Sequence, residues 1–303
     1  MKVRKAVITA AGWGTRLLPL TKAQPKEMLP LLNKPLIQYS VEEAVSCGAE
    51  FVVIVTALGK RAIEDYFDRH FELEHMLEQK GETKLLEEVR YLSNMVDIGY
   101  IRQKEPLGLG YAVLTARNMV GNEPFLLLLP DDVFERRDQI LRKMMQIYES
   151  NQGSVVAVKR VPADEISRYG IVNCRKVSDR LYRITDLVEK PDLKDAPSDL
   201  AIMGRYVLDP QIFEALRDTP PGRNGEIQLT DALRQLLRQQ QLYAYEFEGE
   251  RWDAGTLQGW LETMVALALR DPGIGPGFKD YIRTVAHDVD EPVSGLRCSD
   301  SVD

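Results

Sequence analysis

The stretch that decides the fold is GWGTRLLPLTKAQPKEMLP, residues 12–30. It follows an apolar run at residues 6–11, which predicts a buried strand. The two glycines of GWG allow the backbone to turn tightly and to approach a ligand without a Cβ in the way. Arg16, Lys22 and Lys26 then bring cations to the end of that strand. A glycine loop with cations at a strand end predicts a phosphate-binding site.

Two familiar phosphate motifs do not match this stretch. A dinucleotide fingerprint needs a third small residue at position 17 and an acidic residue about 20 positions further on. Leu17 stands there instead, and residues 31–35 contain no acid. A P-loop needs Gly-Lys-Ser or Gly-Lys-Thr, and no glycine of the chain precedes either pair. The loop therefore belongs to another class of phosphate site.

Strand and helix patterns alternate on both sides of this loop. Residues 51–56 and 125–129 predict buried strands, and residues 36–49 predict a helix with one apolar face. Such alternation predicts an α/β fold with a doubly wound, mostly parallel central sheet, which is Rossmann-like. Ligands bind beyond the carboxyl ends of the strands in such sheets. Both the loop at Gly12 and the acid Asp131 fall at strand ends of this kind.

The second half of the chain is richer in strands. Strands are expected at 155–161, 170–174, 181–188 and 201–208, and amphipathic helices at 227–237 and 257–269. Residues 71–92 are highly charged and predict a helical insertion. We expect a single domain over residues 1–270, with halves at 1–150 and 151–270. A tail follows over 271–303, with a short helix at 278–286 and a loose end at 294–303.

Composition excludes several classes of partner. The formal charge of −7 argues against a nucleic-acid surface or an anionic membrane surface. Three scattered cysteines give neither a disulfide framework nor zinc spacing, and the three histidines form no ligand pattern. The apolar run near the N-terminus is too short for a signal peptide or a membrane span. We therefore expect a cytoplasmic protein without nucleic-acid or membrane partners; its oligomeric state, including a homo-oligomer, stays open.

Two aspartates are candidates for a metal site. Asp131 follows an apolar strand, where a carboxylate can hold Mg²⁺ against phosphate oxygens. Asp253, on the Gly-containing turn 252–256, is the natural second ligand. Taken alone, an aspartate after a strand is more often a helix cap, but the upstream glycine loop favours the metal. Asp132 alternates to the other face of an extended chain and is ranked second.

The motifs together resemble those of the sugar-nucleotide pyrophosphorylases, which belong to the sugar nucleotidyltransferase family. The resemblance spans residues 3–268, and the form PKEMLP at 25–30 is similar to the branch that uses UTP and glucose 1-phosphate. It implies the family fold, with a β-rich sugar-side lobe. It also carries the family's magnesium positions to Asp131 and Asp253. Trp13 departs from the pattern because it is bulkier than the residue expected between the two glycines, and Thr9 replaces an expected proline.

The resemblance also implies roles for further residues. Nucleotide contacts are expected from the loop and from the segment 103–108, at Ala11, Gly12, Gly14, Thr15, Gln103 and Gly108. An amide such as that of Gln103 complements the imide edge of uracil or thymine. Sugar-phosphate contacts are expected at Gly170, Glu189, Lys190 and Gly204. Glutamate can accept hydrogen bonds from sugar hydroxyls, and lysine offers a point charge to phosphate.

The expected reaction is nucleotidyl transfer from UTP to glucose 1-phosphate with release of pyrophosphate. Arg16, Lys26 and Lys190 would stabilise and position the phosphates, and Mg²⁺ would be the cofactor. Two alternatives stay open, a thymidylyltransferase of the same superfamily and a metal-dependent glycosyltransferase that uses a sugar nucleotide. Uracil and thymine differ by one methyl group, which a pocket distinguishes by only about 1–3 kcal/mol.

Overall fold

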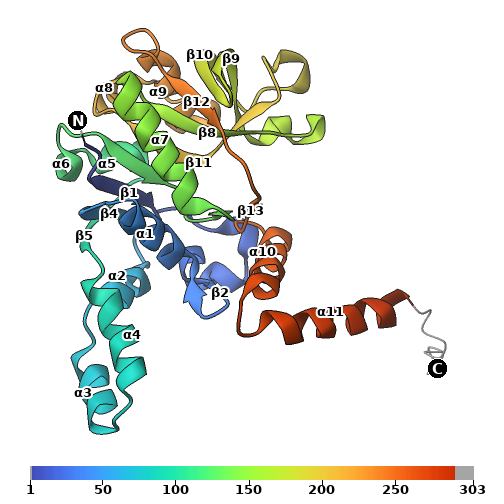
Figure 1. The fold of residues 1–303 in the computed structure, drawn as a ribbon. Helices are drawn as coiled ribbons and strands as arrows, with labels where there is room; N and C mark the ends of the chain where they lie inside the picture. Colours follow the sequence, from blue (N-terminus) through green and yellow to red (C-terminus); the bar gives the residue numbers. More distant parts are fainter. Residues whose placement is uncertain (1, 291–303) are drawn as a thin grey trace, which may run out of the picture.

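The computed structural model describes residues 2–290, apart from the side chains of residues 223 and 287–290. The strands of its main sheet are β1 (Lys5–Thr9), β4 (Phe51–Thr56), β5 (Asp97–Arg102), β6 (Phe125–Leu128), β8 (Val155–Arg160), β9 (Gly170–Ser178), β10 (Leu181–Glu189), β11 (Leu200–Leu208) and β12 (Tyr243–Glu246). Their spatial order is β5-β4-β1-β6-β11-β8-β12-β10-β9 (Figure 1). Two small sheets pair β2 (Pro30–Leu31) with β3 (Lys34–Pro35), and β7 (Asp132–Phe134) with β13 (Arg251–Asp253).

Helices pack on both faces of the main sheet. The α-helices of the described residues are α1 (Leu36–Ser46), α2 (Arg61–Phe67), α3 (Phe71–Gln79), α4 (Thr83–Asn94), α5 (Gly108–Thr115), α6 (Arg117–Val120), α7 (Arg137–Asn151), α8 (Ile212–Asp218), α9 (Leu229–Leu236), α10 (Leu257–Arg270) and α11 (Gly275–Asp290). Short 3₁₀ turns are η1 (Thr15–Leu17), η2 (Leu20–Lys22), η3 (Lys26–Met28), η4 (Ala163–Arg168), η5 (Leu193–Asp195) and η6 (Arg223–Gly225). In β1, Ala6 and Ile8 join one buried cluster with α1 and α7, while Val7 joins the opposite cluster with α5, α8 and α9. This alternation is the physical basis of a sheet that is covered on both sides.

The direction of the strands changes across the sheet. β5, β4, β1 and β6 are parallel, as the alternating pattern predicts. β11 runs antiparallel to both β6 and β8, and β9, β10 and β12 are joined by antiparallel pairs. In this second half the only parallel pair among the described residues is β12 with β8. The predicted parallel arrangement is thus found in the first half of the sheet. In the second half, short connections such as 179–180 between β9 and β10 allow only antiparallel pairing.

Two helical segments project from the body. The predicted helix at 71–92 is a hairpin of α3 and α4, because the chain turns at Gly81, whose φ is +68°. Arg90 on α4 binds Glu74 on α3 with an N–O distance of 3.1 Å and so joins the two helices, while Arg69, which precedes α3, binds the same carboxylate at 2.6 Å. Near the C-terminus α11 is longer than the predicted helix 278–286 (Figure 1). Its start includes Pro276, which fits a first helical turn. The predicted loose end at 294–303 lies outside the described residues.

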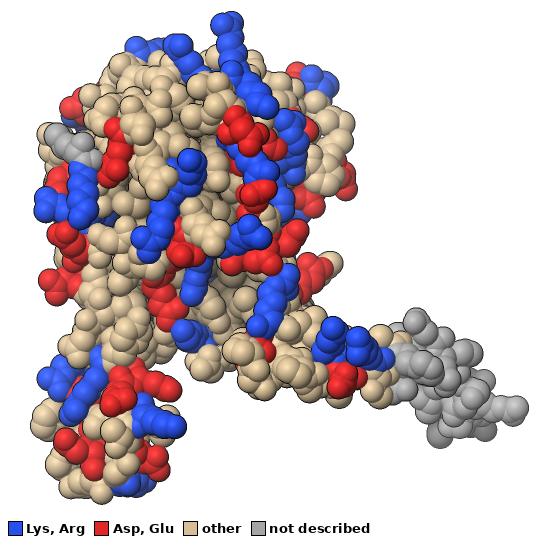
Figure 2. All heavy atoms as spheres, viewed as in Figure 1, with Lys and Arg blue, Asp and Glu red and all other residues tan. Residues whose placement is uncertain are grey.

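Charges of both signs alternate over the face of the molecule that Figure 2 shows. None of the described helices is long and apolar enough to span a bilayer. The carboxyl ends of β1, β4, β5 and β6 share one edge because these strands are parallel. This edge therefore collects the loops that begin after Thr9, Thr56, Arg102 and Leu128.

Candidate active site

Three adjoining cavities lie at this edge of the sheet. The sheet cavity, of about 570 Å³, is lined by residues that include Arg16, Asp131, Glu189, Lys190 and Asp253. The glycine-loop cavity, of about 440 Å³, includes Gly12, Thr15, Arg16, Lys26, Gln103, Gly108 and Asp131. The lysine cavity, of about 530 Å³, includes Trp13, Lys22, Lys26, Leu58, Lys60 and Lys104. Shared lining residues connect the first cavity to the second, and the second to the third.

All but one of the residues predicted from the sequence line these cavities. The predicted sugar-side residues Gly170, Glu189, Lys190 and Gly204 line the sheet cavity together with Arg16, Asp131 and Asp253. The predicted nucleotide residues Ala11, Gly12, Thr15, Gln103 and Gly108 line the glycine-loop cavity together with Lys26. Gly14 is the exception. Its carbonyl accepts a hydrogen bond from the Thr21 hydroxyl at 2.8 Å, and its φ of +68° shapes the loop itself.

Asp131 stands where the sheet cavity meets the glycine-loop cavity. The Lys26 ammonium lies 2.6 Å from its Oδ2, and an Arg16 guanidinium nitrogen lies 3.7 Å from the same atom. Burial alone would raise the pKa of Asp131, but Lys26 outweighs it and the pKa falls to about 2. Burial likewise opposes the charge of Lys26, whose pKa is nevertheless raised by Asp131 and Glu27. Both groups are therefore ionised over the whole physiological pH range.

Asp253 brings a second carboxylate to the same point. Arg16 lies 3.9 Å from Asp253, so its guanidinium bridges the two aspartates, and Arg168 lies 3.3 Å from Asp253. A Cβ on Gly255 would come within 2.7 Å of Asp131 Oδ2 and 3.0 Å of Asp253 Oδ1. The glycine thus leaves room for a small group between the carboxylates. Within the described residues no cluster of three or more His, Cys, Asp or Glu could hold a metal.

Asp132 lines the sheet cavity together with Asp131, although the alternation of an extended chain predicted that it would turn to the other face, and it has a partner of its own. It binds Arg251, whose Nε lies 2.5 Å from Asp132 Oδ1 and whose Nη1 donates to the Tyr169 hydroxyl at 3.1 Å. Burial raises the pKa of Asp132, and Arg251 opposes this rise. A Cβ on Gly204 would come within 1.9 Å of Asp132 Oδ2. Gly204 is therefore required for the close approach of β11 to this carboxylate.

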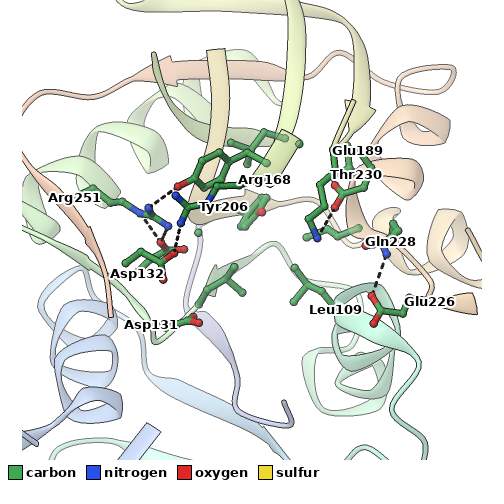
Figure 3. Close-up of a pocket in the computed structure, with 18 of the residues that line it drawn as sticks. Leu109, Asp131, Asp132, Arg168, Glu189, Tyr206, Glu226, Gln228, Thr230 and Arg251 are labelled. Atoms are coloured by element: carbon green, nitrogen blue, oxygen red, sulfur yellow. Dashed lines mark hydrogen bonds and ion pairs between the residues drawn. The ribbon is translucent and has the colours of Figure 1, made fainter. Parts of the chain in front are cut away.

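The opposite wall of the sheet cavity presents a second set of polar groups (Figure 3). The Thr230 hydroxyl donates to Glu189 Oε2 at 2.6 Å, and the Lys190 ammonium lies 3.3 Å from Glu189 Oε1. Gln228 donates to Glu226 at 3.1 Å on the same side. In Figure 3, Asp131, Asp132 and Arg251 stand across the cavity from these residues. The cavity thus has one acid–guanidinium wall and one hydroxyl–carboxylate wall.

Gln103 and Gly108 meet at the mouth of the glycine-loop cavity. Gln103 follows β5 and donates from its amide to the Gly108 carbonyl at 3.3 Å. The backbone of residues 107–110 pairs with Ile227, whose N–H donates to Leu107 at 2.8 Å and whose carbonyl accepts from Gly110 at 2.9 Å. The Gln103 amide is thereby held at the edge of the cavity, beside the backbone of the segment 107–110.

The sequence pattern of the nucleotidyl transferase family matches residues 5–269 of the chain. The chain belongs to this family. It is 49% identical over 285 residues to the UTP–glucose-1-phosphate uridylyltransferase 1 of Staphylococcus saprophyticus, with 94% of this chain and 99% of that protein covered. It is 52% identical over 270 residues to the uridylyltransferase of Bacillus subtilis, with 89% and 92% covered.

Solved structures of nucleotidyltransferases agree in fold. One of them is a UTP-bound UGPase from Acinetobacter baumannii. Its TM-score is 0.86 at 40% identity, and the match covers 93% of this chain and 99% of that chain. A UDP-glucose pyrophosphorylase complexed with UDP-glucose has a TM-score of 0.80 at 43% identity, with 89% and 100% covered. The resemblance read from the motifs is thus confirmed, and so is the α/β nucleotidyltransferase fold.

A buried ion pair supports the segment 129–132, called the acidic loop, on the side away from the cavities of this nucleotidyltransferase. Arg205 on β11 binds Glu43 of α1 through two hydrogen bonds of 2.9 and 2.7 Å. The same guanidinium donates to the carbonyls of Leu129 and Asp132, each at 2.9 Å. These carbonyls flank Asp131 in the chain. Arg205 therefore fixes the backbone that carries the central carboxylate.

Sequence reasoning missed several residues of the site. Arg168, Arg251 and Tyr206 line the sheet cavity without belonging to a recognisable motif. Glu226, Gln228 and Thr230 lie at or just before the start of the segment that the sequence predicts only as an amphipathic helix, residues 227–237. The one available signal for Arg251 was its place in the short segment before Asp253, next to Trp252. No such signal exists for Arg205 and Glu43, which are 162 residues apart.

Proposed function

We propose that this chain transfers UMP from UTP to glucose 1-phosphate, forming UDP-glucose and pyrophosphate. The observation that carries the proposal is the junction of Lys26, Asp131 and Arg16, where the cavity of the predicted nucleotide residues meets that of the predicted sugar residues. A molecule bound in each cavity would bring two phosphates together at this junction. The names of the relatives, which are about 50% identical to this chain, support the same substrates.

The reaction needs no nucleophile from the protein. An oxygen of the sugar phosphate attacks the α-phosphorus of UTP, the bond from that phosphorus to the bridging oxygen breaks, and pyrophosphate leaves. Lys26 is buried and ionised, so it would stabilise the charge on the α-phosphate throughout. Arg16 and the backbone of the glycine loop would hold the departing pyrophosphate. Lys190 would fix the sugar phosphate, while Glu189 would accept hydrogen bonds from sugar hydroxyls.

Asp131 and Asp253 would hold Mg²⁺ in this proposal. The fit rests on two adjacent carboxylates, the room left by Gly255, and a guanidinium that already places positive charge between them. Magnesium needs only one or two protein carboxylates. When bound, the ion would neutralise charge on the phosphate oxygens.

The test is release of pyrophosphate on mixing the protein with UTP, glucose 1-phosphate and Mg²⁺, with UDP-glucose identified as the second product. A glycosyltransferase would release no pyrophosphate, which would contradict the proposal. A thymidylyltransferase would give a larger kcat/KM with dTTP than with UTP. Chelation of the metal should abolish turnover, and full turnover in excess chelator would remove the proposed metal site.

Variants test the individual roles. Lys26→Met and Lys190→Met should each lower turnover by about 10² or more, the scale for removing one charge-stabilising donor. Lys143→Met, on the exposed surface of α7, is the matched control and should behave like the unmodified protein. Circular dichroism checks that each variant is folded. Turnover near that of the control in either variant would exclude that lysine from the reaction. The oligomeric state and the cytoplasmic location stay predictions.

A further inference from the structure

Trp13 is the most exposed tryptophan side chain of the described residues and stands at the centre of the phosphate-binding loop. Its side chain is 74% exposed, although it lies between Gly12 and Gly14 beside the two nucleotide-side cavities. In the part of the chain that the structure describes, neither an aromatic ring nor a cation stacks on its indole. The indole thus offers its faces to something outside the protein.

The surroundings of Trp13 indicate what that ligand is. The glycine-loop cavity and the lysine cavity share six lining residues, namely Ala11, Gly12, Trp13, Lys26, Gln103 and Pro106. Gln103 brings an amide that complements the edge of a pyrimidine base, and Lys26 brings charge for a phosphate. A ligand with both an aromatic ring and phosphates satisfies all three side chains at once. An isolated exposed apolar residue needs no explanation, but one that shares two cavities with such groups does.

We propose that the indole of Trp13 stacks on the base of the bound nucleotide, so that the base is held by its face at Trp13 and by its edge at Gln103. The inference deepens the proposed function and rests on its nucleotide site. Space for the base is free beside the loop, because a Cβ on Gly12 would meet nothing within 4 Å. Stacking recognises a π face that every base has. Trp13 therefore strengthens nucleotide binding without choosing between uracil and thymine.

The experiment compares a ligand with a base and one without. Calorimetry would measure the affinity of UTP, dTTP and inorganic tripolyphosphate for the whole protein and for its Trp13→Ala and Trp13→Phe variants. We expect Trp13→Ala to weaken both nucleotides by roughly 10-fold or more, the scale of one base–aromatic stack, while tripolyphosphate changes less than about twofold. Trp13→Phe should retain most of the affinity. Phe71→Ala, which removes an aromatic side chain that is 73% exposed on α3, is the matched control and should change nothing.

Fluorescence gives a second readout. UTP should quench the emission of the unmodified protein, and the quench should disappear in Trp13→Phe, which keeps Trp252 and Trp260. Unchanged UTP affinity in Trp13→Ala would overturn the inference, and so would equal weakening of UTP and tripolyphosphate, which would mean a distorted loop. If the protein turns over UTP and glucose 1-phosphate but the Trp13 variants bind UTP as well as the unmodified protein does, only the inference is refuted. A stacked nucleotide without turnover refutes the proposed function alone, and no nucleotide binding refutes both.

Discussion

Glu43→Gln removes the charge of one partner in the buried pair behind the acidic loop. The side chains of Arg205 and Glu43 are only 2% and 1% exposed, so water does not screen their interaction. Breaking a buried pair by removing one partner costs about 3–5 kcal/mol, because a buried charge is left without compensation. At roughly 2 °C per kcal/mol for a chain of this size, the melting temperature should fall by about 6–10 °C.

Urea unfolding of the variant measures this loss directly. The matched control is Asp199→Asn, which breaks a pair with Arg160 whose N–O distance is also short, at 2.6 Å, but whose side chains are 45% and 53% exposed. We expect a loss below about 1 kcal/mol for this surface pair. If Glu43→Gln loses no more stability than Asp199→Asn, the argument from burial is refuted.

The double variant Glu43→Leu/Arg205→Met separates stability from function. Replacing a buried pair by apolar residues of similar volume is often neutral or stabilising, so the double variant should recover most of the lost stability. It should still lose turnover, because the carbonyls of Leu129 and Asp132 lose the donor that holds them. Measuring pyrophosphate release beside urea unfolding tests both parts. Full turnover in the stable double variant would remove Arg205 as a positioning residue for Asp131.

Two further predictions concern Asp131 and the residues around it. Gly255→Ala places a Cβ 2.7 Å from Asp131 Oδ2 and should raise the Mg²⁺ concentration needed for half-maximal turnover by about 10-fold or more, while Gly277→Ala, whose Cβ meets nothing within 4 Å, should not. If Gly255→Ala and the unmodified protein reach half-maximal turnover at the same Mg²⁺ concentration, the proposed metal site beside Gly255 is contradicted. The pKa of Asp131 is lowered from 3.8 to about 2, so its contribution to stability is complete above pH 3.8 and is lost as the pH falls through about 2. In Lys26→Met only Arg16 and a backbone hydrogen bond still oppose burial, so the pKa of Asp131 should rise and its contribution to stability should shrink; a pH profile of urea unfolding with an unchanged loss would refute the pairing.

The sequence located the parts of the site that follow buried strands. The loop at Gly12 and Asp131 come just after the buried strands β1 and β6, and the parallel order of these strands takes their ends to one edge. The direction of the later strands could not be predicted in the same way, because periodicity gives the buried face of a strand but not its neighbour. β11 illustrates this point, since it inserts between β6 and β8 and joins the two halves of the chain in one sheet.

The partners of the site residues were beyond prediction for a related reason. Arg251 meets Asp132 across 119 residues, and Arg205 meets Glu43 across 162 residues. A buried cation is stable only where the fold supplies acceptors, and those acceptors here include backbone carbonyls that carry no sequence signal. Motif reasoning therefore finds the groups that face the substrate and misses the groups that hold them.

The ion pairs of the site also explain why its charges persist side by side. The cations proposed to bind phosphate, Lys26 and Arg16, are paired with the acid proposed to bind metal, Asp131. In the proposed reaction a triphosphate would draw the cations away and a metal ion would take over the carboxylates. Either ligand alone would leave buried charges of one sign without partners, which is costly at low dielectric. Nucleotide and metal should therefore strengthen each other's binding by the same factor, as linkage between two sites requires.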